Sequence, residues 1–130
     1  MLRSIFSIIF VFLCTLNISA AQEIPVVTLS ALNKITAKLE TISVSENEMV
    51  KFGTLEITMR TCQSNPPEEA PESVAFLEIT DLGHSGEPSQ VFKGWMFASS
   101  PAISSMEHAV YDVWVTDCKI VDPSASSGNE

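Results

Sequence analysis

Basic side chains are scarce in this sequence. Seven Lys and Arg residues stand against sixteen Asp and Glu residues in a chain of 130, so the formal net charge is -9. Proteins that bind the phosphate backbone of nucleic acids need a basic face, and this balance of charge does not provide one. We therefore expect no nucleic-acid partner, and the length predicts a single domain.

Two sequence patterns that carry chemistry are also missing. The three cysteines include no C-x-x-C pair, which argues against a redox pair or a metal site made of thiolates. The sequence contains no G-x-S-x-G elbow, which marks the nucleophilic serine of many hydrolases. We therefore predict no cofactor, no metal and no catalytic residue from these patterns.

The longest apolar run lies at the amino terminus. Arg3 gives this end a positive charge, residues 5–16 are almost all apolar, and small residues follow at 19–21. These features are typical of a secretory signal peptide over residues 1–21. An uncleaved anchor is the alternative, because residues 4–21 carry no charge and approach the length that spans a bilayer. The short apolar run and the processing site favour cleavage, a periplasmic location and no membrane insertion afterwards.

Cleavage after the signal peptide determines the net charge and the first residue of the mature chain. It removes Arg3 and no acid, so six basic residues face sixteen acidic ones and the net charge becomes -10. We expect a lead at 22–30, one β-rich domain at 31–121 and a disordered tail at 122–130, where small and polar residues dominate.

Export also decides the state of the cysteines. Cys14 leaves with the signal peptide, and Cys62 and Cys118 remain as a pair in an oxidising compartment. We predict a disulfide between them. Closing a loop of that length removes enough entropy from the unfolded chain to stabilise the fold by roughly 4 kcal/mol.

Strand patterns fill most of the mature chain. Leu55, Ile57 and Met59 alternate with polar residues, which predicts a half-buried strand over 51–60. Cys62 falls on the polar side of that alternation, so either a bulge intervenes or the bridge lies at the strand's end and on its other face. Further strands are expected at 74–80, 91–97 and 110–118.

The connecting segments complete the expected fold. A proline-rich acidic stretch at 65–72 predicts a stiff surface loop, and Ser100, followed by proline, predicts a short helical turn through about Glu107. Residues 32–42 fit either a helical stripe or a strand, and the neighbouring strands favour a strand that precedes a hairpin turn at 46–48. Together these patterns predict an all-β fold, a small antiparallel sandwich or partly open barrel with one short helical turn and one disulfide.

Two stretches late in the chain are distinctive. G-W-M-F-A-S-S-P occupies residues 94–101, and Y-D-V-W occupies residues 111–114, ahead of Cys118. With the region from Leu32 onward, they resemble a family of exported bacterial proteins catalogued as a domain of unknown function. The family pattern has an aspartate where this chain has Asn33, and usually a proline where it has Ala109.

This resemblance carries several implications. It implies an envelope location, a bridge between Cys62 and Cys118, and no established activity. Members of such a family are associated with genes for an accessory subunit of the proton-pumping NADH dehydrogenase, which suggests a respiratory or envelope partner.

The same two stretches contain the candidate site residues. If both tryptophan rings lie on the surface with the residues beside them, the apolar patch marks an interface, and if they are buried the motif is scaffold. The set that we single out as an interaction or structural motif is Trp95, Met96, Phe97, Ser99, Ser100, His108, Tyr111, Asp112 and Trp114.

A chemical role for this motif centres on His108. Serines 99, 100, 104 and 105 with His108 and Asp112 contain the ingredients of a hydrolase triad, and Glu107, His108, Asp112 and His84 those of a metal site. Serines beside a proline are explained by capping, however, and adjacent residues in a strand point apart. We favour a structural His108 that bonds to a backbone carbonyl or to Asp112 and pins the turn onto the last strand.

The sequence therefore predicts a non-enzymatic, disulfide-bonded periplasmic β-domain. We expect a protein-interaction or accessory module whose partner is another envelope protein. The alternative is a small hydrolase or metal-binding protein centred on His108.

Overall fold

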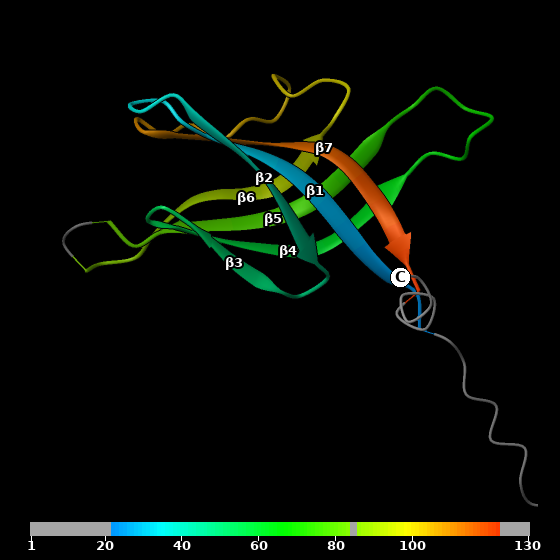
Figure 1. The fold of residues 1–130 in the computed structure, drawn as a ribbon, viewed down its shortest axis with the longest axis horizontal. Coiled ribbons are helices and arrows are strands. Elements are labelled where there is room, and N and C mark those ends of the chain that lie inside the picture. The colour runs from blue at the N-terminus through cyan, green and yellow to red at the C-terminus, as the bar shows by residue number, and fades with distance from the viewer. Residues whose placement is uncertain (1–21, 84–85, 123–130) are drawn as a thin grey trace, which may run out of the picture.

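The computed structural model describes residues 22–83 and 86–122, and within these ranges it contains seven strands and no helix (Figure 1). The all-β prediction is confirmed. The predicted signal peptide, His84 and residues 123–130 of the predicted tail lie outside the described residues. The strands are β1 (Ile24–Asn33), β2 (Lys38–Ser45), β3 (Met49–Phe52), β4 (Leu55–Ser64), β5 (Ser73–Asp81), β6 (Ser89–Phe97) and β7 (Tyr111–Val121).

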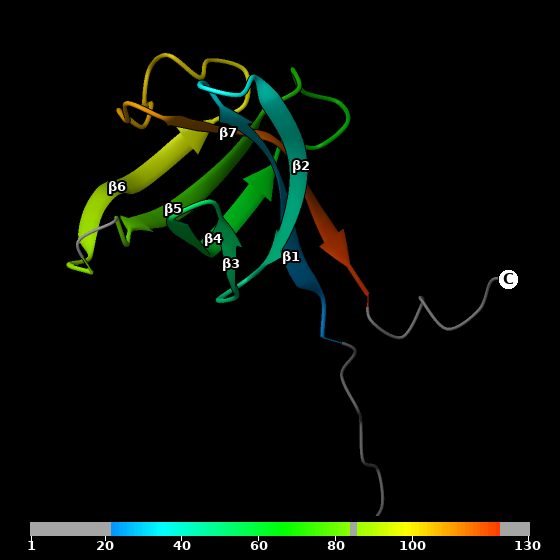
Figure 2. The ribbon, with the colours of Figure 1, turned by 60° about the vertical axis from the view of Figure 1, so that its left-hand side comes forward.

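The strands form two antiparallel sheets that face each other as two layers (Figures 1 and 2). One sheet has the order β2-β1-β7, and the other has the order β3-β4-β5-β6. The first and last strands of the domain are neighbours in the same sheet. Each sheet keeps two edge strands, so the fold is an open sandwich rather than a closed barrel.

β1 takes up most of the segment 22–30, which we expected to precede the domain. Val27, Leu29 and Ala31 are fully buried, and the polar residues between them point to the other face. This strand is the middle one of its sheet and pairs with β2 on one side and β7 on the other. The domain therefore begins earlier than the sequence pattern indicated, because the short alternation in β1 becomes a strand only when two partners satisfy its backbone groups.

Residues 32–42 contain a hairpin turn that the sequence interpretation missed. The strand conformation is correct on both sides of the turn, but the chain reverses after Asn33. The Oδ1 of Asn33 accepts the backbone N–H groups of Ile35 at 3.0 Å and Thr36 at 3.2 Å. An aspartate oxygen can accept the same two bonds, so this turn accommodates either residue at position 33.

A bulge in β4 explains the position of Cys62. The pairing of β4 with β5 shifts between Met59 and Thr61, which leaves Arg60 without an opposite partner in the ladder. One extra residue reverses the side-chain alternation. Cys62 is therefore buried on the same inner face as Met59, and of the two alternatives left open by the sequence the bulge is the correct one.

The disulfide joins the two layers across the core. Cys62 on β4 and Cys118 on β7 are bonded, with a distance of 6.0 Å between their Cα atoms. Both cysteines are buried among the apolar side chains that point inward from the two sheets. The predicted disulfide is confirmed, and it links strands that belong to different sheets.

The segment that crosses from β6 to β7, residues 98–110, does not contain the expected helical turn. One turn is closed by the N–H of Ile103 and the C=O of Ser100 at 3.1 Å, and the chain beyond it is irregular. Ile103 is 76% exposed, whereas Met106 is 5% exposed and joins the core. Residues three apart lie on the same face of a helix, so a helix through both could not place them on opposite sides.

Candidate functional site

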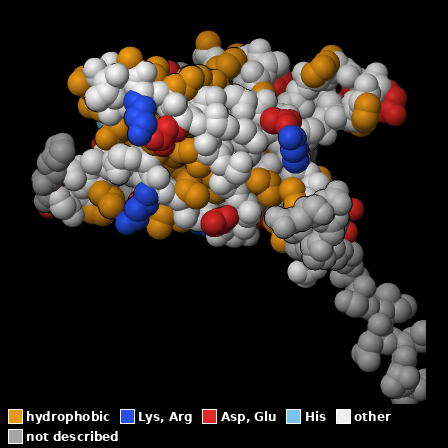
Figure 3. Space-filling view, in the orientation of Figure 1, with side chains coloured by type: hydrophobic (Ala, Val, Ile, Leu, Met, Phe, Trp, Pro, Cys, Tyr) orange, Lys and Arg blue, Asp and Glu red, His pale blue; other side chains and the backbone are white. Residues whose placement is uncertain are grey.

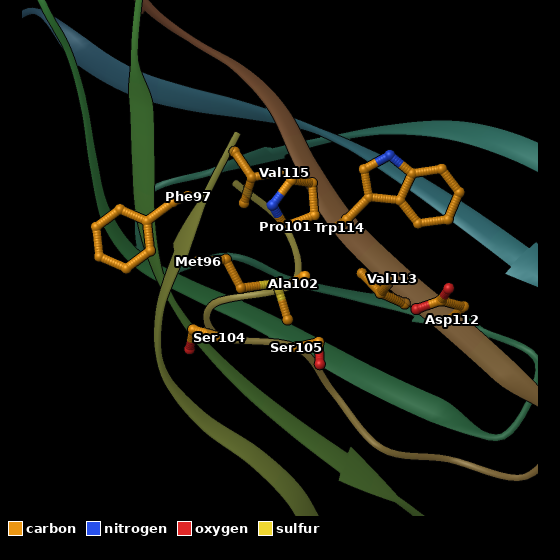
Figure 4. A pocket seen from close by; sticks show the side chains of 10 residues that line it. All are labelled: Met96, Phe97, Pro101, Ala102, Ser104, Ser105, Asp112, Val113, Trp114 and Val115. Carbon is orange, nitrogen blue, oxygen red and sulfur yellow. The ribbon is translucent and has the colours of Figure 1, made fainter. Parts of the chain in front are cut away.

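The crossing segment covers a pocket between the two sheets, which we call the β6–β7 pocket (Figure 4). Its volume is about 380 Å³. The lining comes from the end of β6, from the crossing segment and from the first half of β7. It consists of Met96, Phe97, Pro101, Ala102, Ser104, Ser105, Asp112, Val113, Trp114 and Val115.

The pocket exists because two edge strands meet here without pairing. β6 ends one sheet and β7 ends the other, and neither strand has a hydrogen-bonded neighbour on its outer side among the described strands. Met96 of β6 and Val113 and Val115 of β7 are all almost completely buried. The pocket therefore has an apolar floor, and Asp112 is the only ionisable side chain among its described lining residues.

The Trp95–Phe97 stretch is divided between two faces of one strand. Met96 points inward and is 2% exposed, whereas Trp95 points outward and is 38% exposed. The Trp95 ring packs edge-on against Phe76 of β5, with 5.5 Å between the ring centroids. The next cross-strand pair on this face is Val74 with Phe97. We call these four residues, Val74, Phe76, Trp95 and Phe97, the outer aromatic patch.

Trp114 lies on a different surface from Trp95. It is half-buried on β7 and lines the β6–β7 pocket. In Figure 4 its ring lies on the opposite side of the view from the Phe97 ring, with Met96 and Ala102 between them. The two tryptophans therefore do not form one platform; instead, they lie on either side of the place where the sheet edges meet.

His108 is held by hydrogen bonds at both ring nitrogens. Its Nδ1 accepts the backbone N–H groups of Val110 at 3.0 Å and Tyr111 at 3.1 Å. Because Nδ1 accepts, the proton of the neutral ring lies on Nε2, which donates to the Oδ2 of Asp81 at 2.7 Å. The predicted pinning role is correct in kind, but the partner is Asp81 at the end of β5 and not Asp112 or a backbone carbonyl. Asp112 is excluded because it belongs to the strand that His108 precedes and faces the pocket.

The carboxylate of Asp81 accepts hydrogen bonds from three parts of the chain. Besides His108, the hydroxyl of Thr54 donates to its Oδ1 at 2.6 Å and the N–H of Gly83 donates to the same oxygen at 2.9 Å. These donors lower the pKa of Asp81 from 3.8 to about 2, and the bond from His108 is the largest cause. The carboxylate thus ties the crossing segment to the β3–β4 turn.

Tyr111 completes this end of the sandwich. Its ring lies 5.2 Å from the ring of His108 and packs edge-on against Phe52 at 5.4 Å. Gly53 turns beneath it with φ of +58°, and a Cβ on that residue would lie 2.3 Å from the tyrosine hydroxyl oxygen. The tyrosine is therefore part of the scaffold, packed onto a glycine that has no room for a side chain.

The serines of the motif hold the start of the crossing segment. The hydroxyl and the backbone N–H of Ser99 both donate to the carboxylate of Glu72. These bonds are the main reason that the pKa of Glu72 lies below its ordinary value. Ser100 donates its N–H to the C=O of Phe97 at 3.3 Å, closing a turn. The long-range contact with Glu72 accounts for Ser99, and turn formation accounts for Ser100.

These contacts bear on the chemistry of the motif. In the described part of the chain the imidazole of His108 bonds to Asp81 and to two backbone amides, and not to a serine hydroxyl. Across residues 22–83 and 86–122, no group of three or more His, Cys, Asp or Glu side chains is placed to hold a metal ion. The same ranges contain no helix long and apolar enough to cross a membrane.

The sequence interpretation missed Asp81 and the pocket wall. One local pattern could have identified Asp81: it ends an alternating strand and precedes Gly83 by two residues, which is typical of an aspartate that accepts a bond from its own turn. The pocket had no comparable pattern, because its lining combines residues separated by up to nineteen positions in β6 and β7.

Comparisons with known proteins agree with the resemblance noted from the motifs. Residues 27–118 match the family described as "Uncharacterized protein conserved in bacteria (DUF2155)". The "Uncharacterized protein RP359" of Rickettsia prowazekii (strain Madrid E) is 34% identical over 88 residues, which cover 68% of this chain and 57% of that relative. No solved structure matches this chain. Because the family match spans nearly the whole described domain, the chain belongs to this family of uncharacterised bacterial proteins.

Proposed function

We propose that this domain is a non-enzymatic interaction module that binds another protein of the bacterial envelope. The observation that carries the proposal is the β6–β7 pocket, an apolar cavity of about 380 Å³ that opens between two unpaired sheet edges. Partner proteins commonly anchor large apolar side chains in pockets of this kind, whereas a hydrolytic site needs a nucleophile and a base within hydrogen-bond reach of each other.

The surface around the pocket supports binding to a protein. Ile103, at the tip of the crossing segment, is 76% exposed, and Trp95 in the outer aromatic patch is 38% exposed. Aromatic residues are enriched at protein interfaces because they provide a large contact area at a low entropic cost. On the face shown in Figure 3, apolar side chains lie along the top of the molecule, near the crossing segment.

The arrangement of His108 argues for a structural role in this module. A general base needs a free nitrogen within reach of the proton that it removes. Both nitrogens of His108 bond to groups of the domain itself, and the ring is partly buried between Asp81 and Tyr111. His108 positions the crossing segment, and that segment forms one wall of the pocket.

An envelope location is part of the same proposal. A stable bond between Cys62 and Cys118 needs an oxidising compartment, and the apolar residues 5–16 have the character of a secretory signal. The partner is accordingly sought among periplasmic and inner-membrane proteins, including the accessory proteins of respiratory complexes.

Photocrosslinking in living cells tests the proposal. A photoreactive amino acid placed at Ser105, an exposed residue of the pocket rim, is expected to yield one discrete crosslinked product with an envelope protein. The matched control is Ser43, which is exposed on β2, the edge strand opposite to β7 in the β2-β1-β7 sheet. Crosslinking from neither position, or identical products from both, would overturn the proposal.

A further inference from the structure

We infer that the β6–β7 pocket receives an arginine side chain of the partner protein, with its guanidinium between the carboxylate of Asp112 and the ring of Trp114. The inference rests on the proposed function and specifies which side chain the pocket accepts. It follows from the one carboxylate of the pocket, from the ring beside it and from the places that the domain's own basic side chains occupy.

Asp112 brings an unpaired negative charge to the pocket. It is half-buried, and the described residues provide neither a hydrogen bond nor an ion pair to its carboxylate. Its opposite residue on β1 is Leu32, whose side chain has no polar group to offer. On the outer face of the other sheet, by contrast, Glu78 is paired with both Arg60 and Lys93. The carboxylate of Asp112 is therefore available to a group from outside the domain.

The basic side chains of the domain are all engaged elsewhere. Six Lys and Arg residues fall within the described ranges, and none of them lines the pocket. Lys34 donates to the backbone C=O of His108, and the other five form ion pairs with the carboxylates of Glu40, Glu56, Glu78 and Asp117. A cation that pairs with Asp112 therefore comes from another molecule.

Trp114 lies beside Asp112 on the same face of β7. Side chains two positions apart in a strand point the same way, with roughly 7 Å between their Cα atoms. Both residues line the pocket, and in Figure 4 the carboxylate and the indole ring lie on the same side of the view. A guanidinium can stack on an indole face while its planar N–H groups bond to a carboxylate. A lysine ammonium is a compact point charge without that planar fork, so this pair of residues favours arginine.

The remaining lining suits the aliphatic stem of the same side chain. Pro101 and Ala102 are exposed and Phe97 is half-buried, so the accessible walls are largely apolar. Long basic side chains bury their methylene groups along such surfaces and keep the charged head at a polar rim. A purely apolar side chain would fill the same space, but it would cover Asp112 without pairing its charge, which costs free energy. The combination of apolar walls and one free carboxylate therefore selects a basic side chain.

Peptide binding to the purified native protein tests this inference. The probes are four end-capped pentapeptides, Gly-Ser-X-Ser-Gly, in which X is arginine, its neutral isostere citrulline, lysine or leucine. The NMR signals of the Trp114 indole N–H and the Asp112 amide report on the pocket, and the amide of Thr41 on β2 is the reference. The arginine peptide is expected to shift both pocket signals and to bind about three- to tenfold more tightly than the citrulline peptide, because only arginine carries the charge.

Matched variants separate the contributions of the carboxylate and the ring. Asp112→Asn should weaken binding of the arginine peptide by about two- to fivefold and leave the citrulline peptide unchanged. Glu107→Gln is the control, because it removes the same charge from an exposed residue outside the lining, and it should change neither affinity. Trp114→Leu keeps an apolar side chain but removes the ring face, and it should weaken the arginine peptide by about two- to fivefold. Ala102→Trp fills the pocket from an exposed position and should abolish binding of all four peptides.

The outcomes separate this inference from the proposed function. Failure of the arginine peptide to bind, equal binding of the citrulline peptide or tighter binding of the leucine peptide would overturn the arginine anchor. Binding that shifts neither the Trp114 nor the Asp112 signal would place the peptide elsewhere and would also overturn it. Self-association that occupies the pocket without peptide would assign it to a second copy of this chain, with the same consequence. If the Ser105 crosslink persists while arginine shows no advantage, the interaction module stands and only the anchor is wrong.

Discussion

The imidazole of His108 donates from its Nε2 to the carboxylate of Asp81 across 2.7 Å, and this bond joins the segment before β7 to the end of β5. Asp81 ends β5 of one sheet and His108 precedes β7 of the other, so the bond links the two layers at the end of the sandwich where β5 ends and β7 begins. It also holds the end of the crossing segment, and this segment forms one wall of the β6–β7 pocket.

Replacing Asp81 tests the strength of this contact. Asp81→Asn is expected to lower the free energy of unfolding at neutral pH by about 1–3 kcal/mol, because charge-assisted hydrogen bonds are replaced by weaker ones. Urea unfolding measures the difference. The matched control is Asp112→Asn, since the described residues provide no hydrogen bond to the Asp112 side chain, and its effect is expected to be within about 0.5 kcal/mol. Equal losses in the two variants would contradict the assigned role.

The same carboxylate predicts a pH dependence of stability. The pKa of Asp81 is lowered in the folded protein from 3.8 to about 2. A group with a depressed pKa stabilises the fold fully above its unfolded value and loses that contribution as the pH falls through the folded value. The difference in unfolding free energy between wild type and Asp81→Asn should therefore shrink between pH 4 and pH 2. A difference that is constant over that interval would show that Asp81 is not the titrating group.

Substitutions at Gly53 and Gly86 separate the effect of a steric overlap from the effect of a positive φ. Gly53→Ala is expected to destabilise the fold by more than about 2 kcal/mol, because φ is +58° and the new Cβ would overlap the Tyr111 ring. Gly86→Ala is the control, since φ is +77° there but no atom lies within 4 Å of the new Cβ. It should cost only about 1–2 kcal/mol. Thermal unfolding of both variants makes the comparison, and equal losses would remove the steric explanation.

The disulfide predicts a large effect of reduction. Closing the loop between Cys62 and Cys118, which are 56 residues apart, should contribute roughly 4 kcal/mol. Dithiothreitol is expected to lower the Tm of the native protein and to leave that of the Cys62→Ala/Cys118→Ala double variant unchanged. A native protein whose Tm does not respond after complete reduction would contradict this contribution.

Met96 and Trp95 lie on opposite faces of β6, so alanine substitutions at these neighbouring positions should lower the free energy of unfolding by different amounts. Met96→Ala removes a fully buried side chain and should cost about 2–5 kcal/mol. Trp95→Ala removes a partly exposed ring and should cost less, while binding of a partner to the outer aromatic patch should weaken. Denaturant unfolding ranks the two variants, and a larger loss for Trp95→Ala would place that ring in the core instead.

Export predicts the covalent form of the protein in the cell. Intact-mass measurement of the native protein should show a chain without residues 1–21 and with Cys62 and Cys118 oxidised. An intact amino terminus together with two free thiols would contradict both the signal peptide and the compartment.

Local patterns in the sequence predicted much of the fold. The alternation of Leu55, Ile57 and Met59 identifies a strand face without reference to any other segment, and the structure buries all three residues. The hairpin turn after Asn33 was missed because a local side-chain cap, rather than glycine or proline, reverses the chain there. The helical turn after Ser100 was predicted wrongly because local capping residues favoured it, whereas burial of Met106 decided the path.

The candidate site was less accessible from the sequence. The motif residues were identified, but their separation into core, outer patch and pocket wall depends on which face of β6 and β7 each occupies. Asp81, the partner of His108, lies 27 positions earlier in the chain. Nothing local indicates such a pair, because it forms only when two sheets are stacked.

The sequence by itself determined the all-β character, the inward-facing alternation and the cysteine pair, because each depends on the period of a strand or on the count of thiols. The tertiary structure alone decided that a bulge turns Cys62 inward, that His108 bonds to Asp81, and that two sheet edges enclose a pocket. Those features depend on the register between strands and the stacking of the layers, which are long-range properties of the folded chain.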